Sequence, residues 1–287
     1  MTQRQATLLG RELGWRLRAA MRAADLTGQE MAERLGVTPS QTSRMLTGHR
    51  ASDPAEVATF LTMCGATAAQ REEIVALCQQ HHTPGLLRLD GAQRWISLRE
   101  HTRQARQIVE FAPTMVPWGM QTPAYTAAVA DATDMAADVA MAWGGYRIRL
   151  VDLSDRSRSG MWTVLIHEWA LRTPVGSASL MSEQLHQLLR LSVHPGVTIR
   201  VIPASAGQHA GMTGAGLTVL AFDDLPSLVY REDSATGVFQ ENHSATQHAR
   251  EVLAGLSKST WDPVDSRTLI RRIAVEYSGS VDIDATR

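Results

Sequence analysis

The sequence predicts an α+β fold with two domains, a small all-α domain over residues 1–80 and a larger mixed α/β domain with a small sheet over residues 86–278. The chain has 287 residues, more than the ~100–200 that one domain usually holds. Helix-capping signals recur closely through the first eighty residues. From Met161 onwards, apolar segments typical of strands alternate with amphipathic helical segments, which predicts helices packed on a sheet.

The first eighty residues predict five short helices. Leu13 and Leu17 belong to one apolar stripe of the first helix. Each of the later helices begins at a residue that can cap a helix N-terminus, and these residues are Thr27, Thr38, Asp53 and Thr67. Gly36 and Gly48 are suited to end the second and third helices. The segment 81–85 is expected to be a linker to the second domain.

The second and third helices, joined by a tight turn at Gly36-Val37, are typical of a helix-turn-helix motif. Such a motif places its second helix in the DNA major groove. Gln41 is suited to adenine and Arg44 to guanine, because each side chain offers paired hydrogen-bonding groups. The predicted DNA-binding residues are Gln29, Thr38, Pro39, Ser40, Gln41, Ser43, Arg44, Thr47, His49 and Arg50. The alternative is an ordinary helical bundle with a polar face.

The charge is distributed unevenly along the chain. Residues 1–50 carry eight Arg and four acidic residues, a net charge of +4, so the remainder carries −5 of the overall −1. A basic end on an acidic body is typical of a modular DNA-binding protein, although a solvated surface gives the same count.

The stretch TGQEMAERLGVTPSQTSRMLTGHR (27–50) resembles the XRE-type helix-turn-helix family. The matching features are Ala32, Leu35-Gly36-Val37, Ser43-Arg44 and Gly48. The family usually has Gln where this chain has Gly28, and often has Glu where this chain has Leu46. The resemblance implies a DNA-binding transcription regulator.

The larger domain predicts a mixture of helices and strands. Helices are expected over about 92–110, 123–143, 181–191, 243–257 and 263–275, with a frayed tail from Gly279. Strands are expected over 162–166 and 197–202, and a hairpin over 217–222 and 227–231.

Four segments of this domain carry a second resemblance. They are residues 100–129, RTPVG (172–176), EQLHQLL (183–189) and VTIRVIPASAGQHAGMTGAG (197–216). They resemble the C-terminal domain of actinobacterial XRE regulators of the WhiJ-like developmental group, except that Trp118-Gly119-Met120 replaces the usual Gly-Leu-Leu. The resemblance implies control of gene expression, often together with a small acidic partner protein encoded nearby. It supplies no catalytic residues.

Two places in the larger domain are candidate ligand sites. The glycine-rich loop 206–216 would let backbone N–H groups approach a phosphate, although a plain strand-to-strand loop is favoured. His167-Glu168 and Glu232-Asp233 each follow a strand, and a polar pocket forms if the sheet brings those strand ends together. The candidate ligand-binding residues are His167, Glu168, Gly207, His209, Gly211 and Glu232.

The sequence gives little support for catalysis, metal binding or a cofactor. No metal-ligand spacing and no Gly-x-Ser-x-Gly elbow is present, so we expect no enzyme activity, no metal and no cofactor. Cys64 and Cys78 lie on predicted helices, where Cys78 is expected to be a buried small apolar residue. Trp118, Trp143 and Trp169 would suit a ligand or partner surface, although core packing is the simpler interpretation.

The sequence therefore predicts a cytoplasmic transcription regulator, nucleoid-associated when bound to double-stranded DNA. We expect a homodimer, because one helix-turn-helix reads few base pairs. Its C-terminal domain would bind a ligand or a small protein. Two alternatives stay open, an antitoxin-like interaction protein and an enzyme or nucleotide-binding domain that a helix-turn-helix targets.

Overall fold

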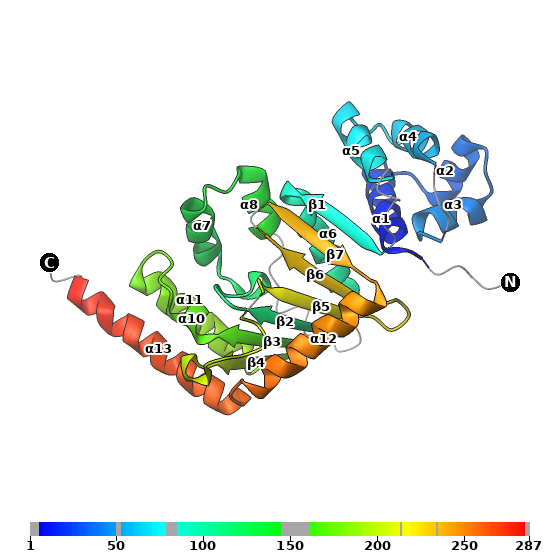
Figure 1. Ribbon diagram of the computed structural model, residues 1–287. Coiled ribbons are helices and arrows are strands. Elements are labelled where there is room, and N and C mark those ends of the chain that lie inside the picture. Colours follow the sequence, from blue (N-terminus) through cyan, green and yellow to red (C-terminus); the bar gives the residue numbers. More distant parts are fainter. Residues whose placement is uncertain are drawn as a thin grey trace. The chain divides into compact units, whose positions relative to one another are not determined.

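The structure is a computed structural model that describes residues 6–49, 53–78, 85–144, 161–212, 214–233 and 235–284 (Figure 1). The chain forms two compact units. One comprises residues 1–87 with 239–242, and the other comprises residues 88–238 with 243–287. Only Gly85 of the predicted linker 81–85 lies within the described residues.

The N-terminal unit contains the five predicted helices. They are α1 (Leu8–Ala23), α2 (Gly28–Leu35), α3 (Pro39–Leu46), α4 (Pro54–Met63) and α5 (Ala68–Cys78). Their apolar faces meet in one core, as the spacing predicts: Leu13, Leu17, Met31, Met45, Phe60 and Leu61 are all buried. Cys78 is also buried in this core, which confirms its prediction as a small apolar residue.

Glycines allow α1 to approach the end of α3 very closely. A Cβ built on Gly14 would lie 2.2 Å from the carbonyl oxygen of Leu46, and one on Gly10 would lie 2.6 Å from that of Gly48. Gly48 itself has a φ of +77°, in the left-handed region that glycine adopts at little cost. These contacts fix α3 against α1 through backbone atoms.

A seven-stranded mixed sheet has the strand order β1-β7-β6-β5-β2-β3-β4, and most of its residues belong to the larger unit. The strands are β1 (Leu86–Asp90), β2 (Gln107–Ala112), β3 (Met161–His167), β4 (Val197–Ile202), β5 (Leu217–Ala221), β6 (Leu228–Glu232) and β7 (Thr236–Gln240). β3 is parallel to β2 and β4, whereas β5 is antiparallel to β2 and β6. This arrangement confirms the α+β class and the predicted β5–β6 hairpin.

Helices pack on both faces of the sheet (Figure 1). They are α6 (Gly91–Gln104), α7 (Pro123–Ala132), α8 (Ala137–Gly144), α10 (Glu168–Arg172), α11 (Ala178–Leu191), α12 (His243–Lys258) and α13 (Pro263–Asp284), with short 3-10 turns η1 (Trp118–Met120) and η2 (Ala204–Ala206). Phe111 and Val219 face α12, where Leu253 and Leu256 complete a core. Glu110 and Thr218 therefore point to the opposite face, because side chains alternate along a strand.

The helix predicted over 92–110 was wrong in its second half. α6 ends at Gln104, Ala105 is extended, and β2 begins at Gln107. The β-branched pair Ile108-Val109 and the aromatic Phe111 favour a strand, and pairing with β3 and β5 outweighs the helical spacing.

Three further predictions need correction. The single helix expected over 123–143 is two helices, α7 and α8, separated by a turn in which Asp134 has a φ of +47°. α13 continues to Asp284 instead of fraying from Gly279. The sheet is larger than expected, because β1, β2 and β7 were not predicted. In the described part of the chain, no helix is long and apolar enough to cross a membrane.

Candidate functional site

Two capping boxes shape the α2–turn–α3 motif. The Glu30 N–H donates to Thr27 Oγ1 (3.2 Å) while the Thr27 N–H donates to the Glu30 carboxylate (2.7 Å). α2 ends at Gly36, whose φ of +66° lets the Val37 N–H bond back to the Ala32 carbonyl (3.0 Å). Pro39 then begins α3, where its fixed φ suits the first helical position. The sequence thus specifies the turn at both of its ends.

α3 divides its side chains between the core and the surface. Thr42, Met45 and Leu46 are buried, so the Leu46 that departs from the XRE pattern is a core residue. Gln41 is half-buried, and Arg50 lies outside the described residues. The other predicted DNA-binding residues are all exposed, namely Gln29, Thr38, Pro39, Ser40, Ser43, Arg44, Thr47 and His49.

Several of these polar side chains bond to their own helix. Gln41 Oε1 accepts from the Thr38 N–H (2.9 Å), so the amide of Gln41 caps α3. Thr47 Oγ1 donates to the Ser43 carbonyl (2.8 Å), and the His49 ring lies 3.0 Å from that hydroxyl. Arg44 makes one long contact, 3.4 Å from Nε to the Ser40 carbonyl. Arg44 is therefore the side chain of α3 best placed to reach a base or phosphate.

The basic residues of this unit do not all face outwards. Arg16 is buried and bonds to Glu12 (2.8 Å) and to Glu73 of α5. Arg11 is also buried and pairs with Glu241, which belongs to the same unit (3.0 Å). These two arginines form ion pairs within the protein, so the net charge of +4 overstates the positive charge available to DNA.

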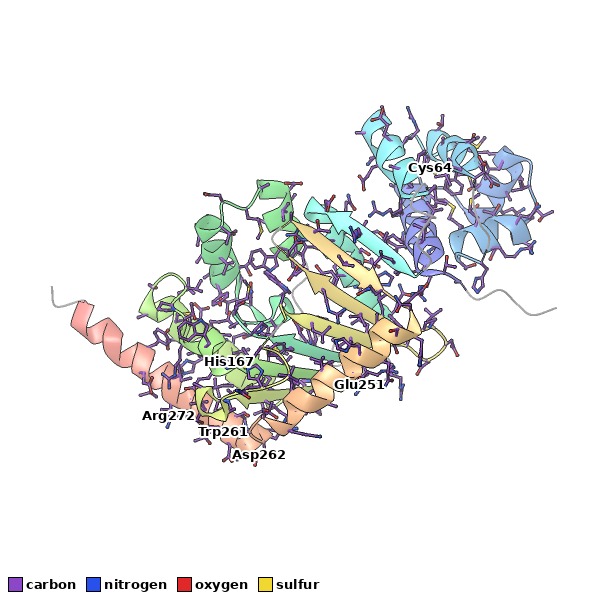
Figure 2. The ribbon with its side chains drawn as sticks, in the orientation of Figure 1. Cys64, His167, Glu251, Trp261, Asp262 and Arg272 are labelled. Atoms are coloured by element: carbon purple, nitrogen blue, oxygen red, sulfur yellow. The ribbon has the colours of Figure 1, made fainter. Side chains whose placement is uncertain are left out.

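In the larger unit, His167, Glu168 and His209 lie close together. Figure 2 labels His167, the last residue of β3. The His167 and His209 ring centroids are 5.4 Å apart. His167 Nδ1 accepts from the Trp169 N–H (3.1 Å), and the Glu168 carboxylate bonds to Arg172 (2.7 Å) and to the Ala204 N–H (2.9 Å). Burial and the neighbouring His209 lower the pKa of His167, which favours its neutral form.

The glycine-rich loop joins β4 to β5, as a strand-to-strand loop was predicted to do. A Cβ on Gly211 would lie 2.6 Å from the Phe111 ring, so this glycine is needed for packing on the sheet. Gly207 has open space around it and a φ of +66°. Thr213 lies outside the described residues.

Glu232 does not join the histidine cluster. β6 and β3 end at the same edge of the sheet, but β5 and β2 lie between them. At about 4.8 Å per strand, the two ends are roughly 14 Å apart. The condition for a common polar pocket is therefore not met, and His167 and Glu232 belong to two separate places.

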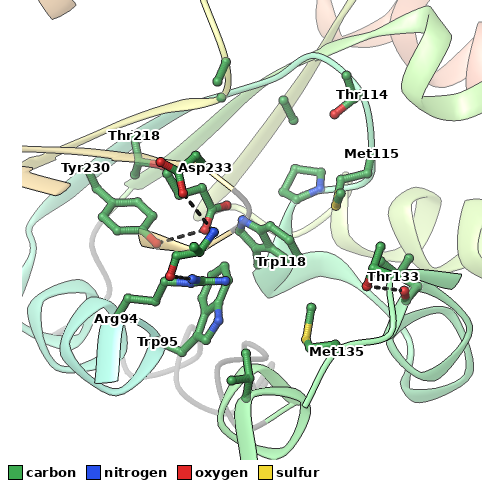
Figure 3. A pocket seen from close by; sticks show the side chains of 18 of the residues that line it. Arg94, Trp95, Thr114, Met115, Trp118, Thr133, Met135, Thr218, Tyr230 and Asp233 are labelled. Atoms are coloured by element: carbon green, nitrogen blue, oxygen red, sulfur yellow. Dashed lines mark hydrogen bonds between the residues drawn. The ribbon is translucent and has the colours of Figure 1, made fainter. Parts of the chain in front are cut away.

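Glu232 lines a cavity of about 680 Å³ within the larger unit (Figure 3). Strand residues Glu110, Thr218 and Tyr230 form its floor, since they are register partners on adjacent strands. Aromatic and thioether side chains and one arginine form its walls, among them Arg94, Trp95, Met115, Trp118 and Met135. Trp95 and Trp118 meet edge to face with centroids 4.5 Å apart.

Both glutamates of this cavity, Glu110 and Glu232, have pKa values well above the usual range of a carboxyl group. Burial, together with the adjacent Glu232, raises the pKa of Glu110 to about 8, against a hydrogen bond with the Trp162 side chain. Burial also raises the pKa of Glu232 to about 7, against hydrogen bonds from Tyr230 and Trp118. Perturbed carboxyl groups in an apolar cavity are typical of functional sites.

Sequence reasoning named Glu232 and Trp118 but missed Glu110, Arg94 and Tyr230. A signal for Glu110 was present, because it is the one charged residue between Ile108 and Ala112 in an otherwise apolar strand.

Trp143 is buried in the core and Trp169 is exposed. Among the described residues, no three His, Cys, Asp or Glu side chains gather as a metal site would require.

The geometry defines a two-part protein, a helix-turn-helix unit joined to an α+β unit with a ligand-sized cavity. Residues 12–74 match a family described as a helix-turn-helix domain. Residues 96–272 match the family described as a domain of unknown function (DUF5753), and the chain belongs to this family.

The comparison with solved structures gives a distant likeness. The structure of TrmBL2, described as an archaeal chromatin protein with a novel mode of DNA binding, aligns at a TM-score of 0.32 and 12% identity. The alignment covers 86% of this chain and 93% of that one. No curated protein sequence matches the chain.

Proposed function

We propose that this protein is a sequence-specific, DNA-binding transcription regulator. The observation that carries the proposal is the helix-turn-helix unit, with α3 capped, fixed against α1 and exposing Ser40, Ser43 and Arg44 along one surface. Short polar side chains allow a helix to enter the major groove closely, and an arginine can bond to guanine or phosphate.

The resemblance of residues 27–50 to XRE-type motifs supports the same function. The resemblance of residues 100–129 and 197–216 to WhiJ-like regulators favours an actinobacterial protein of the developmental type. It would act in the cytoplasm, on the nucleoid. A homodimer is expected, because two-fold dimers read two half-sites about 34 Å apart or at multiples of that distance.

We assign the larger unit a binding role without catalysis. Its cavity of about 680 Å³ supports a small-molecule ligand. A small acidic partner protein, as the WhiJ-like resemblance implies, is the other candidate for this unit.

Footprinting on DNA from the protein's own upstream region tests the proposal. A regulator of this class protects two half-sites centred one or two helical turns apart, and analytical ultracentrifugation of the complex gives two chains per duplex. Protection without a defined boundary would contradict sequence-specific binding. A single protected half-site with one chain would contradict the dimer.

A further inference from the structure

We propose that the cavity of the larger unit binds a small organic cation, an amine or quaternary ammonium group carried on an apolar body. The inference gives a chemical class to the ligand of the proposed function. Binding to the cavity is measured without DNA, so either claim can fail while the other stands.

The charge of the cavity favours a cation. Its described lining contains five acidic residues, Asp90, Glu110, Asp134, Glu232 and Asp233, and one basic residue, Arg94. The Arg94 guanidinium donates to the Ala235 carbonyl and lies 5.3 Å from the Trp95 ring centroid, and its charge offsets only part of the negative charge of the five acidic residues. Because acidic residues outnumber the one basic residue, the charge of the cavity lining favours a positively charged ligand.

Glu110 supplies a specific point of attachment. Its side chain is 94% buried (6% exposed), and its Oε2 atom has no hydrogen-bond partner among the described residues. The Trp162 side chain lies beside this carboxyl, but one of its oxygens stays unpartnered. Burying a carboxylate in that state is costly, so a proton or a cation stabilises it. Glu232 stands nearby with one oxygen bonded to the Tyr230 hydroxyl (2.9 Å) and adds a second negative group.

The walls suit the rest of such a ligand. The rings of Trp95, Trp118 and Tyr230 line the cavity together with Met115 and Met135 (Figure 3). Aromatic faces attract a cation within about 6 Å of the ring centroid, and Trp does so best. The thioether side chains adapt to an apolar body of variable shape. The volume of about 680 Å³ lies within the range of small-molecule sites.

Three probes of one shape and different charge test the proposal with the full-length protein. They are cyclohexylmethylamine, cyclohexylmethanol and cyclohexanecarboxylate, which do not fluoresce. Binding at pH 7.5 is followed by tryptophan fluorescence, because Trp95 and Trp118 line the cavity. We expect the amine to bind saturably and at least ten-fold more tightly than the alcohol or the carboxylate. Equal binding of amine and alcohol, tighter binding of the carboxylate, or no saturation by the amine would each overturn the proposal.

Two variants test whether the cavity glutamates are responsible for the preference for the amine. Glu110→Gln and Glu232→Gln are each expected to weaken the amine at least five-fold and to leave the alcohol within two-fold. Glu183→Gln removes an exposed carboxylate of α11 and serves as the matched control, with no change expected. Should a cavity variant fail to fold, the comparison of the three probes on the natural protein still decides the matter.

Discussion

Thr38 and Gln41 bond to each other in both directions at the start of α3. The Gln41 N–H donates to Thr38 Oγ1 (3.2 Å), and the Thr38 N–H donates to Gln41 Oε1 (2.9 Å). A bidentate contact of Gln41 with adenine needs the same oxygen. Gln41 therefore stabilises the recognition helix, and reading a base would require it to leave the cap.

Gln41→Glu separates these two roles. Glutamate keeps the capping box and suits the first turn of a helix, so the free energy of unfolding should stay within about 0.5 kcal/mol. The added negative charge should weaken binding to specific and random DNA alike. Gln41→Ala should instead cost about 0.5–1 kcal/mol of stability. Thermal unfolding and DNA titrations measure both effects. Loss of preference at a single adenine in Gln41→Ala, with stability intact, would show that Gln41 reads a base.

Arg44→Ala should cost about 1–3 kcal/mol of binding to the specific site and relax the preference at one base pair. Arg44 is exposed, and its one contact with its own helix is long. Arg22→Ala is the control, because it removes the same charge from an exposed position on α1. Titrations against a set of single-base substitutions give the result. An equal loss on every sequence would make Arg44 a phosphate contact.

Gly14→Ala should destabilise the N-terminal unit by about 1–3 kcal/mol, as overpacked sites do. The added methyl would lie 2.2 Å from the Leu46 carbonyl oxygen, a backbone atom that cannot turn aside. Gly28→Ala is the matched control, because nothing lies within 4 Å of its Cβ. Circular dichroism during urea unfolding compares the two. Equal stability of both variants would contradict the close packing of α1 on α3.

The stability of the larger unit should fall as the pH rises from about 4.5 to about 8. The folded state binds protons at Glu110 and Glu232 more tightly than the unfolded state does, because burial raises their pKa values to about 8 and about 7. Arg94, Asp233 and Tyr230 also face this pair. Each carboxyl lowers the free energy of unfolding by up to about 1.4 kcal/mol per pH unit inside its window.

Urea unfolding at several pH values measures this dependence. Tryptophan fluorescence reports mainly on the larger unit, since six of the seven tryptophans follow residue 87. Glu110→Gln should flatten the decline and be more stable than the natural protein at pH 9. The same slope in the variant would mean that Glu110 does not exchange a proton in the folded state over this pH range.

The N-terminal unit was predictable because its signals are local. Thr27, Thr38 and Gly36 set helix ends through contacts within four residues, and each is found at the predicted position. The capping role of Gln41 was missed, although the Thr-x-x-Gln spacing is itself a capping-box signal.

The cavity was not predictable, because its residues meet only through the sheet. Glu110 and Tyr230 are far apart in sequence and become near neighbours through Thr218, which pairs with both. The same pairing turned residues 107–112 into a strand against their helical spacing. A polar pocket between His167 and Glu232 depended on the sheet bringing the two strand ends together. The order of the strands keeps them apart, and no single segment of the sequence determines that order.

The most direct test is the affinity of the purified protein for DNA from its own upstream region at 50 and 200 mM salt, in competition with random DNA. A sequence-specific helix-turn-helix regulator should bind tightly, resist the competitor, and lose affinity steeply at the higher salt as counterions are released. Weak binding that is indifferent to sequence at both salt concentrations would contradict the account.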